Sequence, residues 1–160
     1  MSKNNAFEGG RHKSDKKTVI FDLDGTLVDI EDYEALHKIK SEEFAKIARD
    51  AEANPHMVTE AKLAKKKGED VIILTARSAH YRDITKKWLQ QHGVPYDALY
   101  MRPIDNTEKD KKLKKQIFKD QIKNNFDVVK AYDDKKKNVK MFRKQGIDAE
   151  RVKWKKTNLG

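Results

Sequence analysis

Short apolar runs alternate along the chain with longer segments of helical period. Four runs have strand character because they are short, contain β-branched residues and end at polar residues. They cover residues 18–23, 70–75, 98–101 and 127–132, and a further run at 151–156 is a candidate edge strand. Since their hydrophobicity is continuous rather than alternating, these runs suit a parallel sheet covered by helices on both faces.

The segments between these runs carry start and stop signals of helices. Asn54 and Pro55 form an N-cap and first-turn pair, and helical segments end at Gly68, Gly93 and Gly146. Strand and helix therefore alternate several times. This order predicts an α/β fold with a doubly wound, mostly parallel sheet and helices on both faces.

The domain organisation follows from length and local composition. Residues 1–16 are polar, contain glycine and lack an apolar period, so we expect a mobile N-terminal tail outside the fold. Residues 17–160 are expected to form a single domain, because no repeat or linker divides them.

Composition excludes several classes of protein. The chain has no Cys, which excludes disulfides, thiolate metal sites and cysteine nucleophiles. No apolar run approaches the roughly 18 residues that a membrane span needs, and the N-terminus lacks the apolar stretch of a signal peptide. We therefore expect a soluble, intracellular protein with no membrane partner.

The charge of the chain is strongly basic and unevenly distributed. The net charge of +10 suggests a polyanionic partner, although a basic surface can also serve solubility alone. Residues 109–140 contain twelve Lys against five Asp, a local balance of +7. The positive field is thus concentrated in the second half of the chain.

Polar residues gather where three of the predicted strands end. They are Asp22 and Asp24, Thr75 and Arg77, and Asp133 and Asp134. The carboxyl ends of parallel strands meet at one edge of a sheet, where ligands bind. A carboxylate cluster without Cys or suitably spaced His favours Mg²⁺, so Asp22, Asp24, Asp133 and Asp134 are candidate metal residues. Taken alone, Asp133 and Asp134 could equally cap the following helix.

The sequence "DLDGT" after an apolar strand, the later Thr and Lys, and "DD" after the fourth run resemble the haloacid dehalogenase superfamily of phosphohydrolases. The resemblance implies a Rossmann-like core with a small cap or none. It also implies that Asp22 attacks phosphorus to form an aspartyl phosphate, while Asp24 acts as general acid and base. Thr75 would hold one phosphate oxygen and Arg77 another.

A closer resemblance, over residues 18–155, is to the 3′-phosphatase half of bacteriophage polynucleotide kinase-phosphatase enzymes. It implies an Asp and Lys pair at Asp110 and Lys114. Their i, i+4 spacing would let Asp110 aim Lys114 at the phosphoryl group, with Lys109 as the alternative. The chain has no GxxxxGK[ST] motif, so we expect no P-loop kinase half within these 160 residues. The resemblance implies a protein of the bacterial cytoplasm, encoded by the bacterium or by a phage.

One segment departs from that family. After the first motif the family has a basic, Gly-containing stretch with an Arg, whereas this chain has the acidic, helical "DIEDYEALHKIKSEEFAKIARDAEA". The segment is too short for a large lid, so an open site is expected. The leading hypothesis is a Mg²⁺-dependent phosphatase that removes 3′-phosphates from nucleic-acid ends or nucleotides. The alternatives are a nucleotidase or general small-molecule acid phosphatase and a non-catalytic nucleic-acid-binding module.

Overall fold

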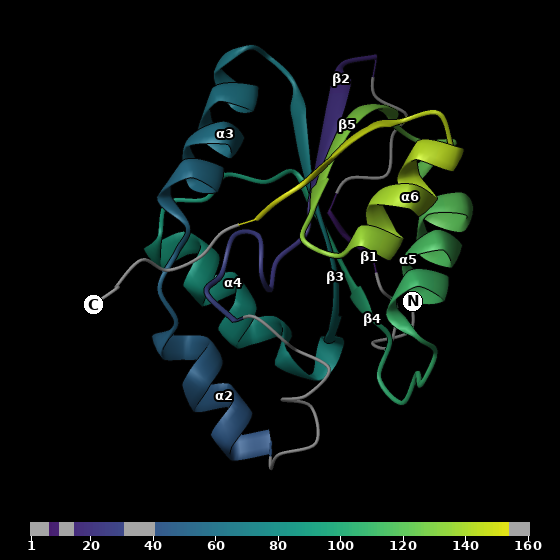
Figure 1. The fold of residues 1–160 in the computed structure, drawn as a ribbon. Helices are drawn as coiled ribbons and strands as arrows, with labels where there is room; N and C mark the ends of the chain where they lie inside the picture. Colours follow the sequence, from purple (N-terminus) through teal and green to yellow (C-terminus); the bar gives the residue numbers. More distant parts are fainter. Residues whose placement is uncertain (1–6, 10–14, 31–40, 154–160) are drawn as a thin grey trace.

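A computed structural model describes residues 7–9, 15–30 and 41–153, and a six-stranded sheet lies at its centre (Figure 1). The strands lie in the order β1-β4-β3-β2-β5-β6. Five are parallel, and β1 pairs antiparallel with β4. The bounds are β1 (Phe7–Gly9), β2 (Lys17–Phe21), β3 (Asp70–Ser78), β4 (Ala98–Arg102), β5 (Asp127–Asp133) and β6 (Asp148–Arg151). The predicted fold class is confirmed.

Helices cover both faces of the sheet, with α2, α3 and α4 on one side and α5 and α6 on the other (Figure 1). Their bounds are α2 (Ser41–Asp50), α3 (Pro55–Lys66), the 3₁₀ turn η1 (Ala79–Tyr81), α4 (Arg82–Gln91), α5 (Asp110–Ile117), the π-helical turn η2 (Phe118–Ile122) and α6 (Lys136–Lys144). Within the described ranges, no helix is both long enough and apolar enough to cross a bilayer.

Alternate residues of the central strands supply two separate apolar cores. In β2, Val19 and Phe21 belong to the core beneath α2, α3 and α4, whereas Ile20 belongs to the core beneath α5 and α6. All three side chains are at most 5% exposed. Because both faces of the strand are buried here, each position from Val19 to Phe21 is apolar, which explains the continuous hydrophobicity of the sequence.

Helix ends follow the local signals in the sequence. The side chain of Asn54 accepts a hydrogen bond from the backbone N–H of His56 (3.2 Å), and Pro55 begins α3. The chain turns out of α3, α4 and α6 at glycines with positive φ, as predicted. These are Gly68, Gly93 and Gly146.

Both edges of the sheet differ from the prediction. Residues 1–16 were expected to form a tail outside the fold, but Phe7–Gly9 form β1. This strand pairs with β4, and Phe7 lies opposite Tyr100. A three-residue strand is too short to show in a hydrophobic pattern, yet it covers an edge that would otherwise expose unpaired backbone groups. At the other edge, β6 begins at Asp148, before the predicted run. Residues 1–6, 10–14 and 154–160 lie outside the described ranges.

The acidic segment after the first motif contributes α2; residues 31–40 of the predicted helical stretch lie outside the described ranges. The fully buried Phe44 of α2 contacts the ring of Tyr81 (centroids 4.6 Å apart), and the indole N–H of Trp88 donates to the carbonyl of Ala51 (2.9 Å). The ring of Phe44 also lies 5.4 Å from the guanidinium carbon of Arg77. The helix is thus anchored on α4 beside a residue predicted to be functional.

Candidate active site

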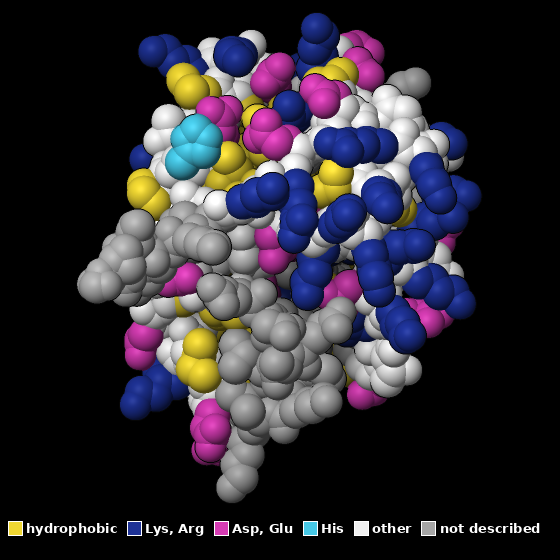
Figure 2. All heavy atoms as spheres, viewed as in Figure 1, with side chains coloured by type: hydrophobic (Ala, Val, Ile, Leu, Met, Phe, Trp, Pro, Cys, Tyr) yellow, Lys and Arg dark blue, Asp and Glu magenta, His cyan; other side chains and the backbone are white. Residues whose placement is uncertain are grey.

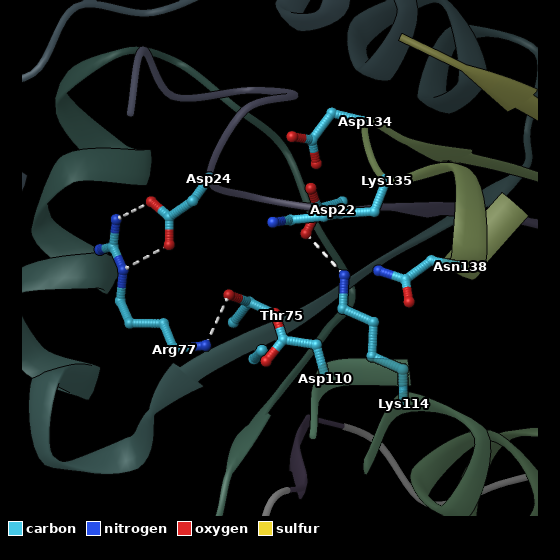
Figure 3. Close-up of a pocket in the computed structure, with 10 residues that line it drawn as sticks. Asp22, Asp24, Thr75, Arg77, Asp110, Lys114, Asp134, Lys135 and Asn138 are labelled. Carbon is cyan, nitrogen blue, oxygen red and sulfur yellow. Dashed lines mark hydrogen bonds and ion pairs between the residues drawn. The ribbon is translucent and has the colours of Figure 1, made fainter. Parts of the chain in front are cut away.

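The predicted site residues other than Asp133 line one pocket at the carboxyl ends of β2, β3 and β5 (Figure 3). In the sheet, β2 lies between β3 and β5. The chain adds β3 and β4 on one side of β2 and then β5 and β6 on the other, and ligands usually bind where this direction reverses. The lining consists of Asp22, Asp24, Thr75, Ala76, Arg77, Asp110, Lys114, Asp134, Lys135 and Asn138. All six residues predicted to be catalytic are therefore brought together.

A tight turn after β2 presents Asp22 to the pocket. The carbonyl of Leu23 accepts hydrogen bonds from the N–H groups of Leu27 and Val28 (both 2.9 Å). Gly25 has φ +86°, and a Cβ there would overlap the carboxylate of Asp134. Only glycine fits this backbone conformation and this approach without strain. The glycine of "DLDGT" therefore lets the first and last acidic motifs meet.

Thr26, the last residue of that motif, orients the predicted nucleophile. Its buried hydroxyl donates to Asp22 Oδ2 at 2.9 Å. Its carbonyl accepts from the side-chain amide of Asn54 (3.1 Å), the N-cap residue of α3. The start of α3 is thereby tied to the turn that carries Asp22.

Lys114 joins two of the acidic residues. Its amine donates to Asp22 Oδ1 (2.7 Å) and Asp133 Oδ2 (2.8 Å), and the side chain is 2% exposed. Burial lowers the pKa of Lys114, but the charges of Asp133 and Asp22 outweigh that effect and raise the pKa above its ordinary value. The lysine is therefore charged at neutral pH. The structure places Lys114 in the pocket, while Lys109 is the N-cap residue of α5.

The structure shows that Asp110 does not orient Lys114. Asp110 was expected to aim Lys114 across one helical turn. Instead, the carboxylate of Asp110 accepts from Arg102 (2.9 Å), and Asp22 and Asp133 orient Lys114. Arg102 is near enough to Asp110 because both flank the same loop, whereas Lys114 points toward a stronger negative cluster.

Asp22, Asp133 and Asp134 form a group that could hold a cation, with one oxygen of each within 4.8 Å of the others. Burial, followed by the charge of Asp22, raises the pKa of Asp134 to about 9 and also raises that of Asp133. Within the described part of the chain, Asp134 Oδ1 is buried without a hydrogen-bond partner. An all-oxygen group with an unpaired buried carboxylate oxygen fits Mg²⁺.

Asp133 is held by three donors. Lys114 donates to Oδ2, the backbone N–H of Lys135 donates to Oδ1 (2.9 Å), and the side-chain amide of Asn138 reaches both oxygens (3.2 Å each). Asn138 is 2% exposed and was missed in the sequence. Its only signal was a polar residue on the apolar face of a helix that follows "DD".

Asp24 lies apart from this group because it forms a buried ion pair with Arg77 (Figure 3). Arg77 Nη2 donates to Oδ1 at 2.6 Å and Nε to Oδ2 at 3.3 Å. Arg77 also donates to the hydroxyl of Thr85 (2.9 Å) and is 1% exposed. A buried carboxylate and guanidinium left unpaired would be costly, so each satisfies the other.

This ion pair changes two expectations. The guanidinium of Arg77, expected to grip a phosphate oxygen, is directed to Asp24, and Asp24 is separated from the three carboxylates with which it was expected to bind metal. The backbone N–H of Arg77 donates to the hydroxyl oxygen of Thr75 (3.0 Å). This bond does not use the hydroxyl hydrogen of Thr75, and its donation to a phosphate oxygen stays a prediction.

Arg102 organises the loop beside the pocket and was missed in the sequence. It donates to the carbonyls of Ala76 (2.8 Å) and Glu108 (2.6 Å), to the side chain of Asn106 (3.0 Å) and to Asp110. The loop between β4 and α5 is thereby fixed to β3. The strand-end rule that identified Thr75 could have found Arg102, which ends β4.

Comparison with known proteins identifies the family. Residues 16–155 match the family model described as the polynucleotide kinase PNKP phosphatase domain, a haloacid dehalogenase-type family. A protein of Autographa californica nuclear polyhedrosis virus, named as a bifunctional polynucleotide kinase/RNA ligase, is 29% identical over 129 residues, which are 79% of this chain and 18% of the viral protein.

Solved structures agree with that match. Two chains from structures of a Pnkp1/Rnl/Hen1 complex, the second described as an RNA repair complex, are 30% identical, with TM-scores of 0.74 and 0.75. The similarity covers 91% and 90% of this chain, and 50% and 44% of theirs. A class C acid phosphatase from Bacillus anthracis shares the fold at 21% identity and TM-score 0.60, over 78% of this chain and 54% of the other.

This chain thus spans half or less of the repair-complex chains and less than a fifth of the viral protein. The family match, which covers most of the chain, agrees with the fold and with the grouping of the motif residues in one pocket. The resemblance seen in the sequence is confirmed. The chain belongs to the haloacid dehalogenase-type family of polynucleotide kinase phosphatase domains.

Proposed function

We propose that the chain is a Mg²⁺-dependent phosphomonoesterase that removes 3′-phosphates from nucleic-acid ends or nucleotides through an aspartyl phosphate on Asp22. The observation that supports this most directly is the setting of Asp22. Its carboxylate lines the pocket and belongs to the group that includes Asp133 and Asp134, with its two oxygens fixed by Lys114 and Thr26. A fixed carboxylate needs no base to act as a nucleophile.

In the first step, an Asp22 oxygen attacks phosphorus and the bond from phosphorus to the ester oxygen breaks. Asp24 gives a proton to the departing oxygen, so the alcohol leaves neutral. Arg77 holds both Asp24 oxygens from one side, and each oxygen keeps a second lone-pair site for the proton. Arg77 is therefore proposed to position Asp24 rather than to bind substrate.

In the second step, Asp24 takes a proton from a water molecule that attacks the phosphorus of the aspartyl phosphate. The bond between phosphorus and the Asp22 oxygen breaks, which releases inorganic phosphate and restores Asp22. The Lys114 amine and the Thr75 hydroxyl are placed to donate hydrogen bonds to phosphoryl oxygens during both steps.

We propose that Asp22 and Asp134 would hold the metal through their carboxylates. Each oxygen of Asp133 accepts two hydrogen bonds, from Lys114, Lys135 and Asn138, whereas each oxygen of Asp22 accepts one, from Lys114 or Thr26. Asp134 Oδ1 has no partner among the described residues. Bound Mg²⁺ would supply positive charge against the phosphoryl group and the carboxylates. Asp133 would then support the site through Lys114, and Asp24 is not proposed as a side-chain ligand.

The substrate is tested with three phosphate esters. The family and the viral relative's name support a polynucleotide substrate, and the 3′ position is proposed from the resemblance in the sequence. We expect a higher kcat/KM for a short oligonucleotide with a single 3′-phosphate than for the same oligonucleotide with a 5′-phosphate or for a 3′-mononucleotide. Equal rates at both ends would indicate a general phosphatase, and a preference for the mononucleotide would indicate a nucleotidase. The first result would overturn the assignment to 3′-phosphates, and the second would overturn the nucleic-acid end as the preferred substrate.

Asp24→Asn should reduce kcat most for substrates with a poor leaving group. We expect about a 10²- to 10⁴-fold loss of kcat for an alkyl phosphate such as a 3′-nucleotide, because an amide cannot protonate the departing oxygen. An aryl phosphate leaves without that proton, so its first step should lose much less. Steady-state and single-turnover rates with both esters measure the difference, with Asp120→Asn, an exposed carboxylate on η2, as control. Equal losses for both esters would remove Asp24 from the acid role.

Magnesium should stabilise the folded chain through Asp134. A ligand present at 100 times its Kd adds about 2.7 kcal/mol to the free energy of unfolding, so the melting temperature should rise with Mg²⁺. Asp134→Asn should lose most of this rise, while Asp120→Asn should keep it. A full rise in Asp134→Asn would place the ion elsewhere.

Without metal, Asp134→Asn should be at least as stable as the parent. The pKa of Asp134 rises from 3.8 to about 9 in the folded state, so this carboxyl lowers stability progressively as the pH rises between those values. Urea unfolding in the presence of a chelator at pH 6 and pH 8 measures the effect, and the advantage of the variant should be larger at pH 8.

A further inference from the structure

A groove between α5 and α6 is lined by five lysines and lies outside the pocket described above. The groove has a volume of about 130 Å³, and its lining consists of Lys111, Lys115, Lys137, Lys140, Lys144, Met141 and Gln145. We call this groove the lysine groove. Figure 2 shows dark blue side chains gathered over this side of the molecule.

Helical spacing sets the lysines on facing sides of two packed helices. Lys111 and Lys115 are four residues apart on α5, and Lys137, Lys140 and Lys144 are three and four apart on α6, so each set shares one helix face. All five side chains are exposed. No acidic residue lines the groove, and within the described ranges none of the five lysines forms an ion pair.

Such an arrangement costs stability in the free protein. Like charges on adjacent helix turns repel, and the usual remedy is an interspersed carboxylate. Other lysines of the same region have one, since Lys112 pairs with Glu108 (3.2 Å) and Lys130 with Asp148 (3.3 Å). The groove lysines therefore present a concentrated positive field that a bound polyanion would neutralise.

The lysine groove is continuous with the catalytic pocket through shared residues. Lys111 and Lys137 also line the larger hollow formed by the β4–α5 loop and the start of α6. That hollow shares Asp110, Lys135 and Asn138 with the pocket that contains Asp22. A chain molecule with one end at Asp22 could therefore run across the loop and into the groove.

Resting on the function proposed above, we propose that the lysine groove binds backbone phosphates of the nucleic-acid strand whose 3′-terminal phosphate lies at Asp22. The groove presents several cations in sequence, which suits a repeating phosphate backbone. Lys137 to Lys144 spans about 10 Å at 1.5 Å per residue, enough for more than one phosphate. The lining has a single apolar side chain, the buried Met141, so it lacks the apolar anchors that a membrane-bound helix uses.

The test compares two triple variants. Lys137→Gln, Lys140→Gln and Lys144→Gln together remove three groove charges. The control removes three exposed lysines from the opposite face of the sheet, Lys62→Gln, Lys66→Gln and Lys67→Gln. Both are combined with Asp22→Asn, so that binding is measured without turnover. The probe is a fluorescent 3′-phosphorylated single strand, as DNA and as RNA, titrated over a salt series.

Each lost phosphate contact on a single strand should reduce the slope of log K against log salt by about 0.7, so the groove variant should lose about 2. The control variant should keep the parental slope. If the groove variant keeps it as well, or if both variants change equally, the strand does not lie in the groove and the proposal is overturned. Comparison of the DNA and RNA probes shows which backbone the groove binds.

A second readout separates this proposal from the phosphatase assignment. With Asp22 present, the groove variant should lose kcat/KM for the oligonucleotide and keep that for a 3′-mononucleotide. Unchanged activity on both substrates would overturn the groove alone. Absence of 3′-phosphate release by the parent would overturn the proposed function, and the salt slopes of the Asp22→Asn proteins would still decide where the strand binds.

Discussion

Asp22→Asn should lower phosphatase turnover by at least about 10⁴-fold, the scale seen when a covalent nucleophile is removed. The amide cannot attack phosphorus, and it loses the negative charge that pairs with Lys114 at 2.7 Å. The measurement is turnover of an aryl phosphate with Mg²⁺ present, since a good leaving group needs no help from Asp24.

The variant should remain folded, which keeps the result interpretable. Asp22→Asn removes one of three carboxylates that lie within 4.8 Å of one another, so it relieves repulsion while it weakens one ion pair. Thermal unfolding checks this, with Asp120→Asn as the matched control. Near-parental turnover in a folded Asp22→Asn protein would contradict the aspartyl-phosphate mechanism.

The sequence predicts well which strand ends form the site, because this depends only on the order of the strands in the sheet. Asp22 directly follows β2 and Asp133 ends β5, while Thr75 ends the predicted apolar run within β3, which continues to Ser78. The strands β3, β2 and β5 are neighbours in the sheet. Once the runs are assigned to one parallel sheet, their carboxyl ends must lie together. No side-chain detail is needed for that step.

Side-chain pairing is harder to predict because it depends on distances across the fold. Asp24 and Arg77 are 53 residues apart, and only the folded structure shows that the guanidinium turns toward Asp24. Lys114 was selected from a local helical pairing with Asp110, yet its partners are 92 and 19 residues away. Arg102 and Asn138 act on loops and carboxylates whose positions no local pattern specifies.

Lys114→Met should both destabilise the chain and impair its activity. The change leaves the buried carboxylates of Asp22 and Asp133 without their cation, and breaking a buried ion pair by removing one partner costs about 3–5 kcal/mol. Methionine nearly matches the length of the lysine stem, so lost packing contributes little. Loss of a donor placed beside the reacting phosphoryl group should lower kcat by about 10²- to 10³-fold.

The neighbouring residue supplies a close control. Lys115 is on the same helix and exposed, so Lys115→Met makes the same chemical change without touching the acidic cluster. Urea unfolding of both variants, with chelator and with Mg²⁺, measures the cost. The Lys114→Met deficit should shrink when Mg²⁺ is present, because the ion neutralises the same carboxylates. If the two variants unfold alike in chelator, Lys114 does not offset the charge of Asp22 and Asp133, and the electrostatic account of the site is wrong.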